Sequence, residues 1–178
     1  MSTDALLVHL LMYVLVPVWL AAGFADYLCH RSAALERTSG AKESLLHLVQ
    51  FAEVGVPLMA VLFLEVTAAV LLLMVVALVL HQATAIWDVR YANDTRRVSS
   101  AEQHVHGVLE MVPFIAVAMM AVVHRDQLGE PNFAIMLKRD PLPSWYLCGA
   151  VAGAAILGIL PYGEELLRSV RAARHKRG

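Results

Sequence analysis

Apolar residues in this chain gather in five long runs, and short polar segments separate the runs. Each run approaches the roughly 20 residues that a helix needs to cross the hydrocarbon core of a bilayer. The runs therefore predict five transmembrane helices, over about residues 5–28, 45–64, 68–90, 102–123 and 145–162. Little more than Glu65 and Thr67 separates the second run from the third, so these two helices should form an antiparallel hairpin.

Composition agrees with an all-α integral membrane protein. Hydrophobic residues make up 59% of the 178 residues and charged residues 16%, whereas soluble domains have about 45–50% and ~25%. Five spans use most of the chain, so we expect one transmembrane domain over residues 1–178. The N-terminus lacks the positive segment of a secretory signal, so we expect the first helix to be retained. The two cysteines, Cys29 and Cys148, fall at opposite predicted membrane faces, which argues against a disulfide.

Lys and Arg residues predict the orientation of the helices. Eleven of them fall in segments that the topology places on one side: Arg31, Arg37, Lys42, Arg90, Arg96, Arg97, Arg168, Arg171, Arg174, Lys176 and Arg177. The other side has only Arg125, Lys138 and Arg139. The positive-inside rule predicts a multi-pass protein of the cell inner membrane, with its N-terminus outside and its C-terminus in the cytoplasm. Topology and attraction to anionic lipid explain the basic tail, and we expect no nucleic acid partner.

Ionisable residues accumulate near the predicted cytoplasmic ends of the first four helices. Inside a membrane such side chains cost roughly 2.5–3.5 kcal/mol each on insertion scales, so each requires a partner. The members of this predicted layer are Asp26, His30, Glu43, His47, His81, Asp88, Glu102, His106 and Glu110, with Gln50 and Glu53 slightly deeper. Their common depth predicts a single polar site inside the bundle.

Helical geometry selects among neighbouring histidines in this layer. At about 100° per residue, Asp26 and His30 share a helix face, and so do His106 and Glu110. His104 and His106 point about 160° apart, so they cannot both face inward. We favour His106, because it aligns with Glu110.

A weak internal repeat relates the two halves of the layer. Each half has an Asp followed by a Glu and a His four residues apart: Asp26 with Glu43 and His47, then Asp88 with Glu102 and His106. The repeat predicts that the first four helices form a pseudo-twofold four-helix bundle around the polar site. Two-metal sites in helix bundles are built from such inward-facing groups, although their usual Glu-x-x-His spacing is absent here.

Two roles without a metal stay open for part of this set. Glu43 and Glu102 begin helices, where a carboxylate stabilises free backbone N–H groups. Residues near the interface, such as Asp88, could instead pair with Arg31 or Arg90. The deeper residues, Glu53, His81 and Glu110, are harder to explain in these ways.

Imidazole and carboxylate ligands without thiolate suit iron, with manganese or zinc as alternatives, and several carboxylates favour a dinuclear centre. The predicted metal ligands are Asp26, His30, His47, Glu53, His81, Asp88, His106 and Glu110; Glu43, Glu102, His104 and Gln50 are supporting residues or alternative ligands. In this scheme the imidazoles are terminal ligands, Glu53 and Glu110 are candidate bridges, and Asp26 and Asp88 complete the coordination.

The leading functional hypothesis is a di-iron membrane oxidoreductase: an oxidase, a hydroxylase of the monooxygenase type, or a desaturase. Its hydrophobic, lipid-like substrate would enter from the bilayer and react on the cytoplasmic side. Electrons would come from an external reductase or quinol, because the sequence contains no nucleotide-binding fingerprint. Two alternatives are a b-type haem electron-transfer subunit, with histidine ligands, and a proton or metal-ion carrier that uses Glu53 and Glu110.

Overall fold

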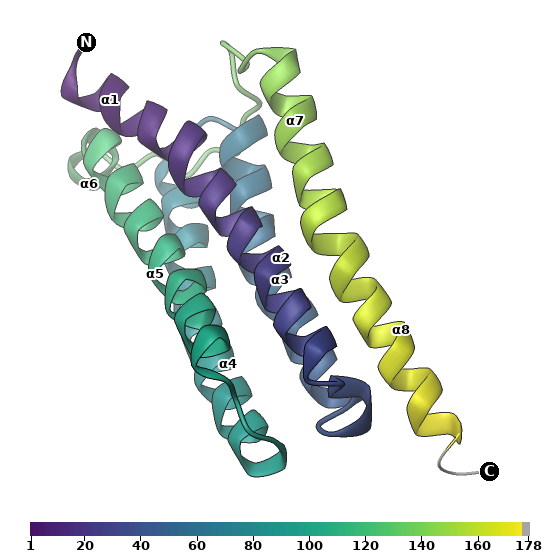
Figure 1. The fold of residues 1–178 in the computed structure, drawn as a ribbon. Coiled ribbons are helices and arrows are strands. Elements are labelled where there is room, and N and C mark those ends of the chain that lie inside the picture. Colours follow the sequence, from purple (N-terminus) through teal and green to yellow (C-terminus); the bar gives the residue numbers. More distant parts are fainter. Residues whose placement is uncertain (176–178) are drawn as a thin grey trace.

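The computed structural model describes residues 1–175, and these residues form an all-helical molecule (Figure 1). Five helices are long and apolar enough to span a membrane, which confirms the predicted number. The chain order is α1 Thr3–Leu10, a π-helical turn Leu11–Leu15, α2 Val16–Ser32, a 3₁₀ turn Leu35–Arg37, α3 Ala41–Phe63, α4 Ala68–Thr95, α5 Ser100–Val123, α6 Asp126–Gly129, α7 Ser144–Ala154, a π-helical turn Ala155–Ile159 and α8 Leu160–His175. Lys176 and Arg177 of the predicted basic tail lie outside the described residues.

The first and fifth spans each contain a π-helical turn just ahead of a proline, Pro17 or Pro161. Proline lacks an N–H and its ring crowds the carbonyl four residues earlier. A wider π turn at this point lets each helix continue. The fifth span therefore runs on to His175, well beyond the end near residue 162 that the sequence predicted.

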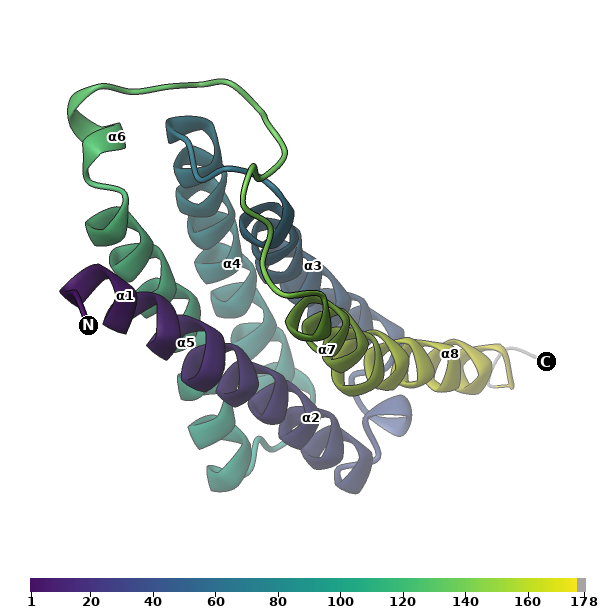
Figure 2. The same cartoon turned by 90° about the horizontal axis from the view of Figure 1, so that it is seen from above.

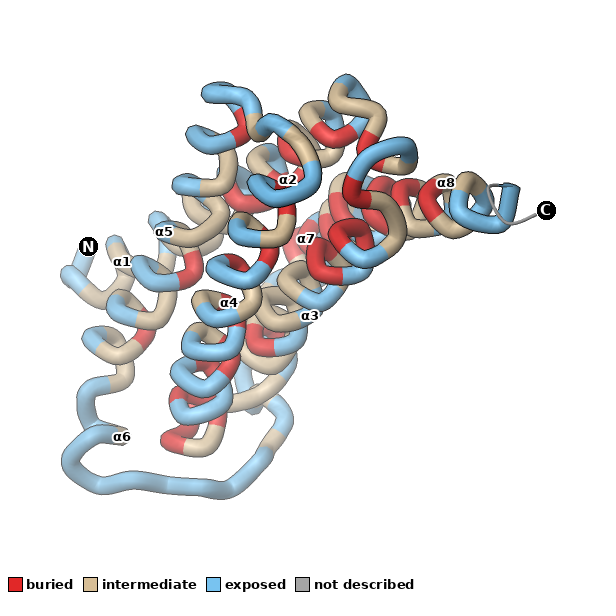
Figure 3. The backbone as a smooth tube through the Cα atoms, turned by 90° about the horizontal axis from the view of Figure 1, so that it is seen from below, coloured by how far each residue is buried: buried red, intermediate tan, exposed pale blue. Residues whose placement is uncertain are grey.

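The first four spans form a bundle, and the fifth packs on one side of it (Figure 1). Helix α2 packs on α5, α3 on α4, and α4 on α5, while α8 packs on α2 and α3. Buried residues face the inside of this arrangement, and exposed residues cover its outside (Figure 3). The outward residues include large apolar side chains such as Val79, Phe114 and Ile156, which suits contact with lipid.

A long segment, residues 130–143, connects α6 to α7 and passes across the ends of α3 and α4 (Figure 2). Backbone hydrogen bonds hold it there: Glu65 N–H donates to the Met136 carbonyl at 2.9 Å, and Lys138 N–H donates to the Phe63 carbonyl at 3.0 Å. The segment thereby lies against the turn between α3 and α4, at the end of the bundle that faces away from the polar layer.

Candidate metal centre

Glu165 of α8 lies between two buried histidines from different helices. His30 Nδ1 donates to its Oε2 at 3.0 Å, and His47 Nδ1 donates to its Oε1 at 2.9 Å. The two imidazole rings stack, with centroids 4.1 Å apart and planes 10° apart. All three side chains are at least 95% buried, so one carboxylate orients both rings in a site shielded from water.

The other nitrogen of each of these rings faces carboxylates. His30 Nε2 lies 3.3 Å from Asp26 Oδ1 and 3.3 Å from Glu102 Oε1. His47 Nε2 lies 3.2 Å from Asp88 Oδ2. These Nε2 atoms thus point towards two separate groups of acidic oxygens.

His106 joins the first of these groups. Its Nε2 lies 3.0 Å from Asp26 Oδ1, whereas the neighbouring His104 is exposed. On the other side of the layer, Glu43 Oε1 lies 3.8 Å from His47 Nε2. Each group therefore combines imidazole nitrogen with carboxylate oxygen.

Several of these atoms are buried without a hydrogen bond that satisfies normal geometry. Among the described residues, the atoms include His30 Nε2, His47 Nε2, Asp26 Oδ1 and Asp88 Oδ1. Two sets of ligand atoms each lie within 4.8 Å of one another: Asp26, His30 and His106 form one set, and His30, Glu43 and His47 form the other. The two sets share His30, and each set, taken separately, contains the kinds of atom that could hold a metal ion.

Arg96 closes the layer at the end of the bundle where α4 is connected to α5. Its Nε donates to Glu43 Oε1 at 3.1 Å, and its Nη1 donates to Glu102 Oε2 at 3.0 Å. Burial lowers the pKa of Arg96, but the hydrogen bonds and charges of Glu102 and Glu43 outweigh this effect and raise the pKa above its ordinary value. The guanidinium is therefore a permanent positive charge beside the candidate ligands.

Glu102 also begins helix α5. The Glu102 N–H donates to Ser99 Oγ at 3.2 Å, and the Glu102 carboxylate accepts a bond from the Ser99 N–H at 3.4 Å. This capping box is the structural role that the sequence left open for Glu102. The same helix start fixes the carboxylate next to Arg96 and His30, so capping and site geometry reinforce each other.

Glu53 and His81, predicted as ligands, form a separate and deeper polar group. His81 Nδ1 lies 3.7 Å from Glu53 Oε2, and Thr84 Oγ1 donates to Glu53 Oε1 at 2.9 Å. Gln50 and Glu110 line the small cavity between this group and the layer. The structure thus divides the predicted site into an inner layer and a neighbouring group.

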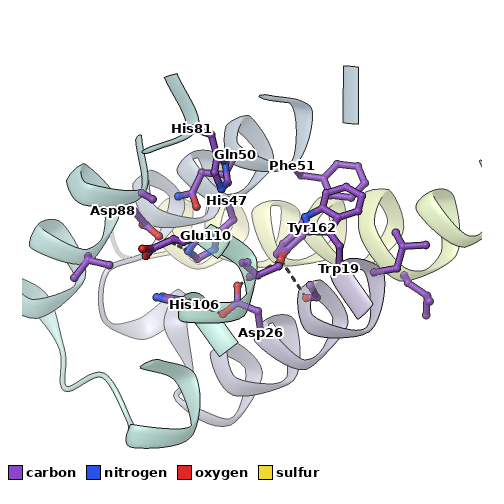
Figure 4. Close-up of a pocket in the computed structure, with 16 residues that line it drawn as sticks. Trp19, Asp26, His47, Gln50, Phe51, His81, Asp88, His106, Glu110 and Tyr162 are labelled. Carbon is purple, nitrogen blue, oxygen red and sulfur yellow. Dashed lines mark hydrogen bonds and ion pairs between the residues drawn. The ribbon is translucent and has the colours of Figure 1, made fainter. Parts of the chain in front are cut away.

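That small cavity has a volume of about 40 Å³. Trp19 and Phe51 lie together at one end of it, and Asp88 and Glu110 lie at the other (Figure 4). One water occupies roughly 10–15 Å³ on this scale, so the space suits a few waters or small ions.

Sequence reasoning missed three residues that build the site. Glu165 lies beyond the predicted end of the fifth span near residue 162, Tyr162 lies at that end and was not considered, and Arg96 was counted only as an orientation signal. Tyr162 Oη donates to the Gly23 carbonyl at 3.1 Å and so fastens α8 to α2. The spacing of Tyr162, Glu165 and Ser169 places them on one helical face and was the available signal.

No protein family, curated protein or solved structure matches this chain. Its function is therefore inferred from the geometry and charge of this site.

Proposed function

We propose that this protein is a membrane metalloenzyme whose buried layer binds two metal ions. Charge balance is the observation that supports this most directly. Five buried carboxylates meet one arginine, which leaves a net charge of −4 when the imidazoles are neutral; the carboxylates are Asp26, Glu43, Asp88, Glu102 and Glu165. Uncompensated buried charges cost several kcal/mol each. Two divalent cations would neutralise the net charge of −4.

Protonating the histidines would be the other way to balance this charge. The layer would then be held by ion pairs alone, with His30, His47 and His106 as imidazolium ions. Two of these cations would lie in rings stacked 4.1 Å apart, and like charges at that distance repel strongly in a poorly solvated site. Neutral rings avoid this repulsion, and they leave both Nε2 atoms free to bind metal.

The contacts of Glu165 support the metal-binding form of both rings. A carboxylate that accepts the Nδ1 proton fixes the tautomer with a free Nε2 and orients the ring, as carboxylates commonly do behind metal-bound histidines. One ion would then be held by Asp26, His30 and His106. The other would be held by His47 with Asp88 and Glu43.

Reciprocal contacts support the pseudo-twofold bundle as part of this proposal. His106 binds Asp26 at 3.0 Å, and His47 approaches Asp88 at 3.2 Å, so each half of the repeat supplies the histidine that meets the other half's aspartate. Arg96 contacts Glu43 and Glu102, the two equivalent glutamates. These three relations are what a local twofold axis through the layer would produce.

Iron is the proposed metal, with manganese or zinc as alternatives, because the ligands are imidazole and carboxylate without sulfur. Two iron ions would supply the redox chemistry for O₂-dependent oxidation of a hydrophobic substrate by an oxidase, hydroxylase or desaturase. The chain itself orients the ligands through Glu165, balances their charge through Arg96 and excludes water by burial. Electrons would come from a separate reductase or quinol, at the cytoplasmic side of the cell inner membrane.

The geometry favours metal ions over haem. Two axial histidines approach a haem iron from opposite faces of the macrocycle, whereas the His30 and His47 rings stack directly on each other. The small cavity is also far smaller than a haem. A carrier is disfavoured because the larger cavity beyond Trp19 has almost entirely apolar walls.

Metal content and oxygen uptake test this proposal together. Protein purified in nanodiscs should contain close to two iron, manganese or zinc ions per chain, and the chemically reduced iron form should consume O₂. His47→Ala should lose both properties. The control variant His104→Ala, which removes an exposed histidine of α5, should retain them. Wild-type protein with metal well below one equivalent, or metal unaffected by His47→Ala, would overturn the dinuclear site; loaded protein that does not react with O₂ would overturn the oxidase assignment.

A further inference from the structure

A second, larger cavity of about 190 Å³ lies in the half of the bundle away from the polar layer. Its walls come from the first four spans and from α7, and most of its lining residues are apolar, such as Leu15, Leu58, Met74 and Val117. An apolar cavity of about 150 Å³ is enough to bind one benzene molecule. The space therefore suits one aliphatic chain and has too little volume for the two chains of a phospholipid.

The inner end of this apolar cavity meets the candidate metal centre at Trp19, which lines both cavities. Trp19 is only 5% exposed and stacks on Phe51, with ring centroids 5.3 Å apart. Glu53 also lines the apolar cavity. A ligand that fills the cavity would therefore end against Trp19, next to the polar layer.

Two basic side chains line the outer end of the cavity. Lys138 and His124 line it, and the backbone bond from Lys138 to Phe63 holds the lysine above the bundle. Partial burial lowers the pKa of Lys138, and the more distant Glu65 carboxylate only partly offsets this effect. Among residues 1–175, the Lys138 ammonium forms no ion pair, so it lacks a close anion.

An apolar channel with an unpaired cation at one end is complementary to a molecule with an anionic head and an apolar tail. We propose that the cavity binds a single-chain aliphatic carboxylate, with its carboxylate at Lys138 and its chain directed towards Trp19. The distal carbons of the chain would then lie beside the candidate metal centre. Binding itself requires no metal, but the role of this molecule as substrate rests on the proposed function.

Quenching of Trp19 fluorescence by bromine reports the direction of the chain. Trp87 and Trp145 are more than half exposed, so Trp87→Phe and Trp145→Phe leave Trp19 as the single fluorophore with little disturbance. In nanodiscs of uncharged lipid, 12-bromododecanoate should quench Trp19 saturably. The isomer 2-bromododecanoate should compete for the site and quench at least threefold less. Equal quenching by the two isomers, or quenching that never saturates, would overturn the proposal.

Matched substitutions test the contact of the ligand's carboxylate with Lys138 and the fit of its chain in the apolar cavity. Lys138→Met should weaken apparent binding about fivefold or more, as expected for loss of a charged contact, whereas the exposed neighbour Arg139→Met should change it less than twofold. Ala116→Leu fills the channel and should also weaken binding, while Ala118→Leu, on the exposed face of the same helix, should not. Unchanged binding in Lys138→Met, or competition by dodecanol as strong as by dodecanoate, would overturn the carboxylate assignment.

The same titration on chelator-treated protein separates this inference from the proposed function. Saturable binding without metal supports the channel even where metal analysis fails. Metal-loaded protein that reacts with O₂ but does not bind the bromo acids would support the proposed enzyme function and overturn the proposed ligand.

Discussion

His30 and His47 stack with ring centroids 4.1 Å apart, although one comes from the end of the first span and the other from the start of the second. Neither ring could keep this position alone, because each needs a partner for its Nδ1 atom in a site without water. Glu165 from the fifth span provides both partners. The stacked pair is therefore the point at which three spans are joined and the candidate ligands are oriented.

Glu165→Gln should weaken metal binding by about 10- to 100-fold, the usual effect of losing an orienting carboxylate. A carboxamide oxygen can accept one Nδ1 proton, but the adjacent NH₂ group is a donor and would force the other ring into the opposite tautomer. That ring would then lose its free Nε2 atom. Competition with a calibrated chelator measures the affinity.

Glu164→Gln is the matched control for Glu165→Gln. Glu164 is the preceding residue, is partly exposed and pairs with Arg31 and Arg168. Such surface pairs contribute about 0–1 kcal/mol to stability, so metal affinity should stay at the wild-type value. Equal affinities in both variants would show that Glu165 does not orient the ligands.

Arg96→Met should destabilise the metal-free protein by about 3–5 kcal/mol, because it leaves two buried carboxylates without their cation. The exposed neighbour Arg97→Met should change stability by less than about 0.5 kcal/mol. Thermal unfolding of both variants with a chelator present measures the difference. A similarly small loss of stability in both variants would show that Arg96 does not stabilise the buried carboxylates of Glu43 and Glu102.

The stabilisation by Arg96 should also be independent of pH over the accessible range. Its folded pKa is raised above the ordinary value, so the stabilisation is fully present below the ordinary pKa of an arginine and is lost only as pH rises above it. The difference between wild type and Arg96→Met should therefore stay constant from about pH 7 to pH 9. A steady decline across this window would show that a different, titrating group is responsible.

Gly158→Ala should displace the aromatic pair at the boundary of the two cavities. A Cβ atom at this position would clash with Cε2 of Phe51, and Phe51 stacks on Trp19. Overpacking of this kind destabilises by about 1–3 kcal/mol and should shift the Trp19 emission. Gly149→Ala, whose Cβ meets nothing within 4 Å, should be neutral or slightly stabilising.

Fusions after Gly178 test the proposed orientation. Green fluorescent protein should fluoresce there, because it folds in the cytoplasm, whereas alkaline phosphatase should be inactive, because it needs the outer compartment. Activity of the phosphatase fusion without fluorescence of the other would invert the topology.

The sequence was sufficient for the five spans, because apolar runs long enough to cross a bilayer are rare in soluble proteins. It also placed Asp26, His47, Asp88 and His106 at one depth, since ionisable residues near helix ends form a readable pattern. The sequence also placed Glu53 and His81 deeper, but it could not show that they form a group of their own. Their mutual contact depends on how α3 and α4 are rotated, and the hydrophobic pattern of a lipid-facing bundle fixes rotation poorly.

Two other omissions have definite physical causes. Pro161 normally ends a helix, and only the π turn before it lets the fifth span continue to Glu165. Arg96 looks like any loop arginine, because its contacts with Glu43 and Glu102 depend on how the helix ends are brought together in space. Both residues belong to the site through tertiary contacts that local patterns do not encode.

The most direct test of the dinuclear centre is an anaerobic titration of metal-free protein with iron(II). A dinuclear site predicts saturable binding of two equivalents per chain, and loss of both in the His30→Ala, His47→Ala double variant when its helical content is retained. Absence of saturable binding in the wild type, or two equivalents still bound by the double variant, would contradict it.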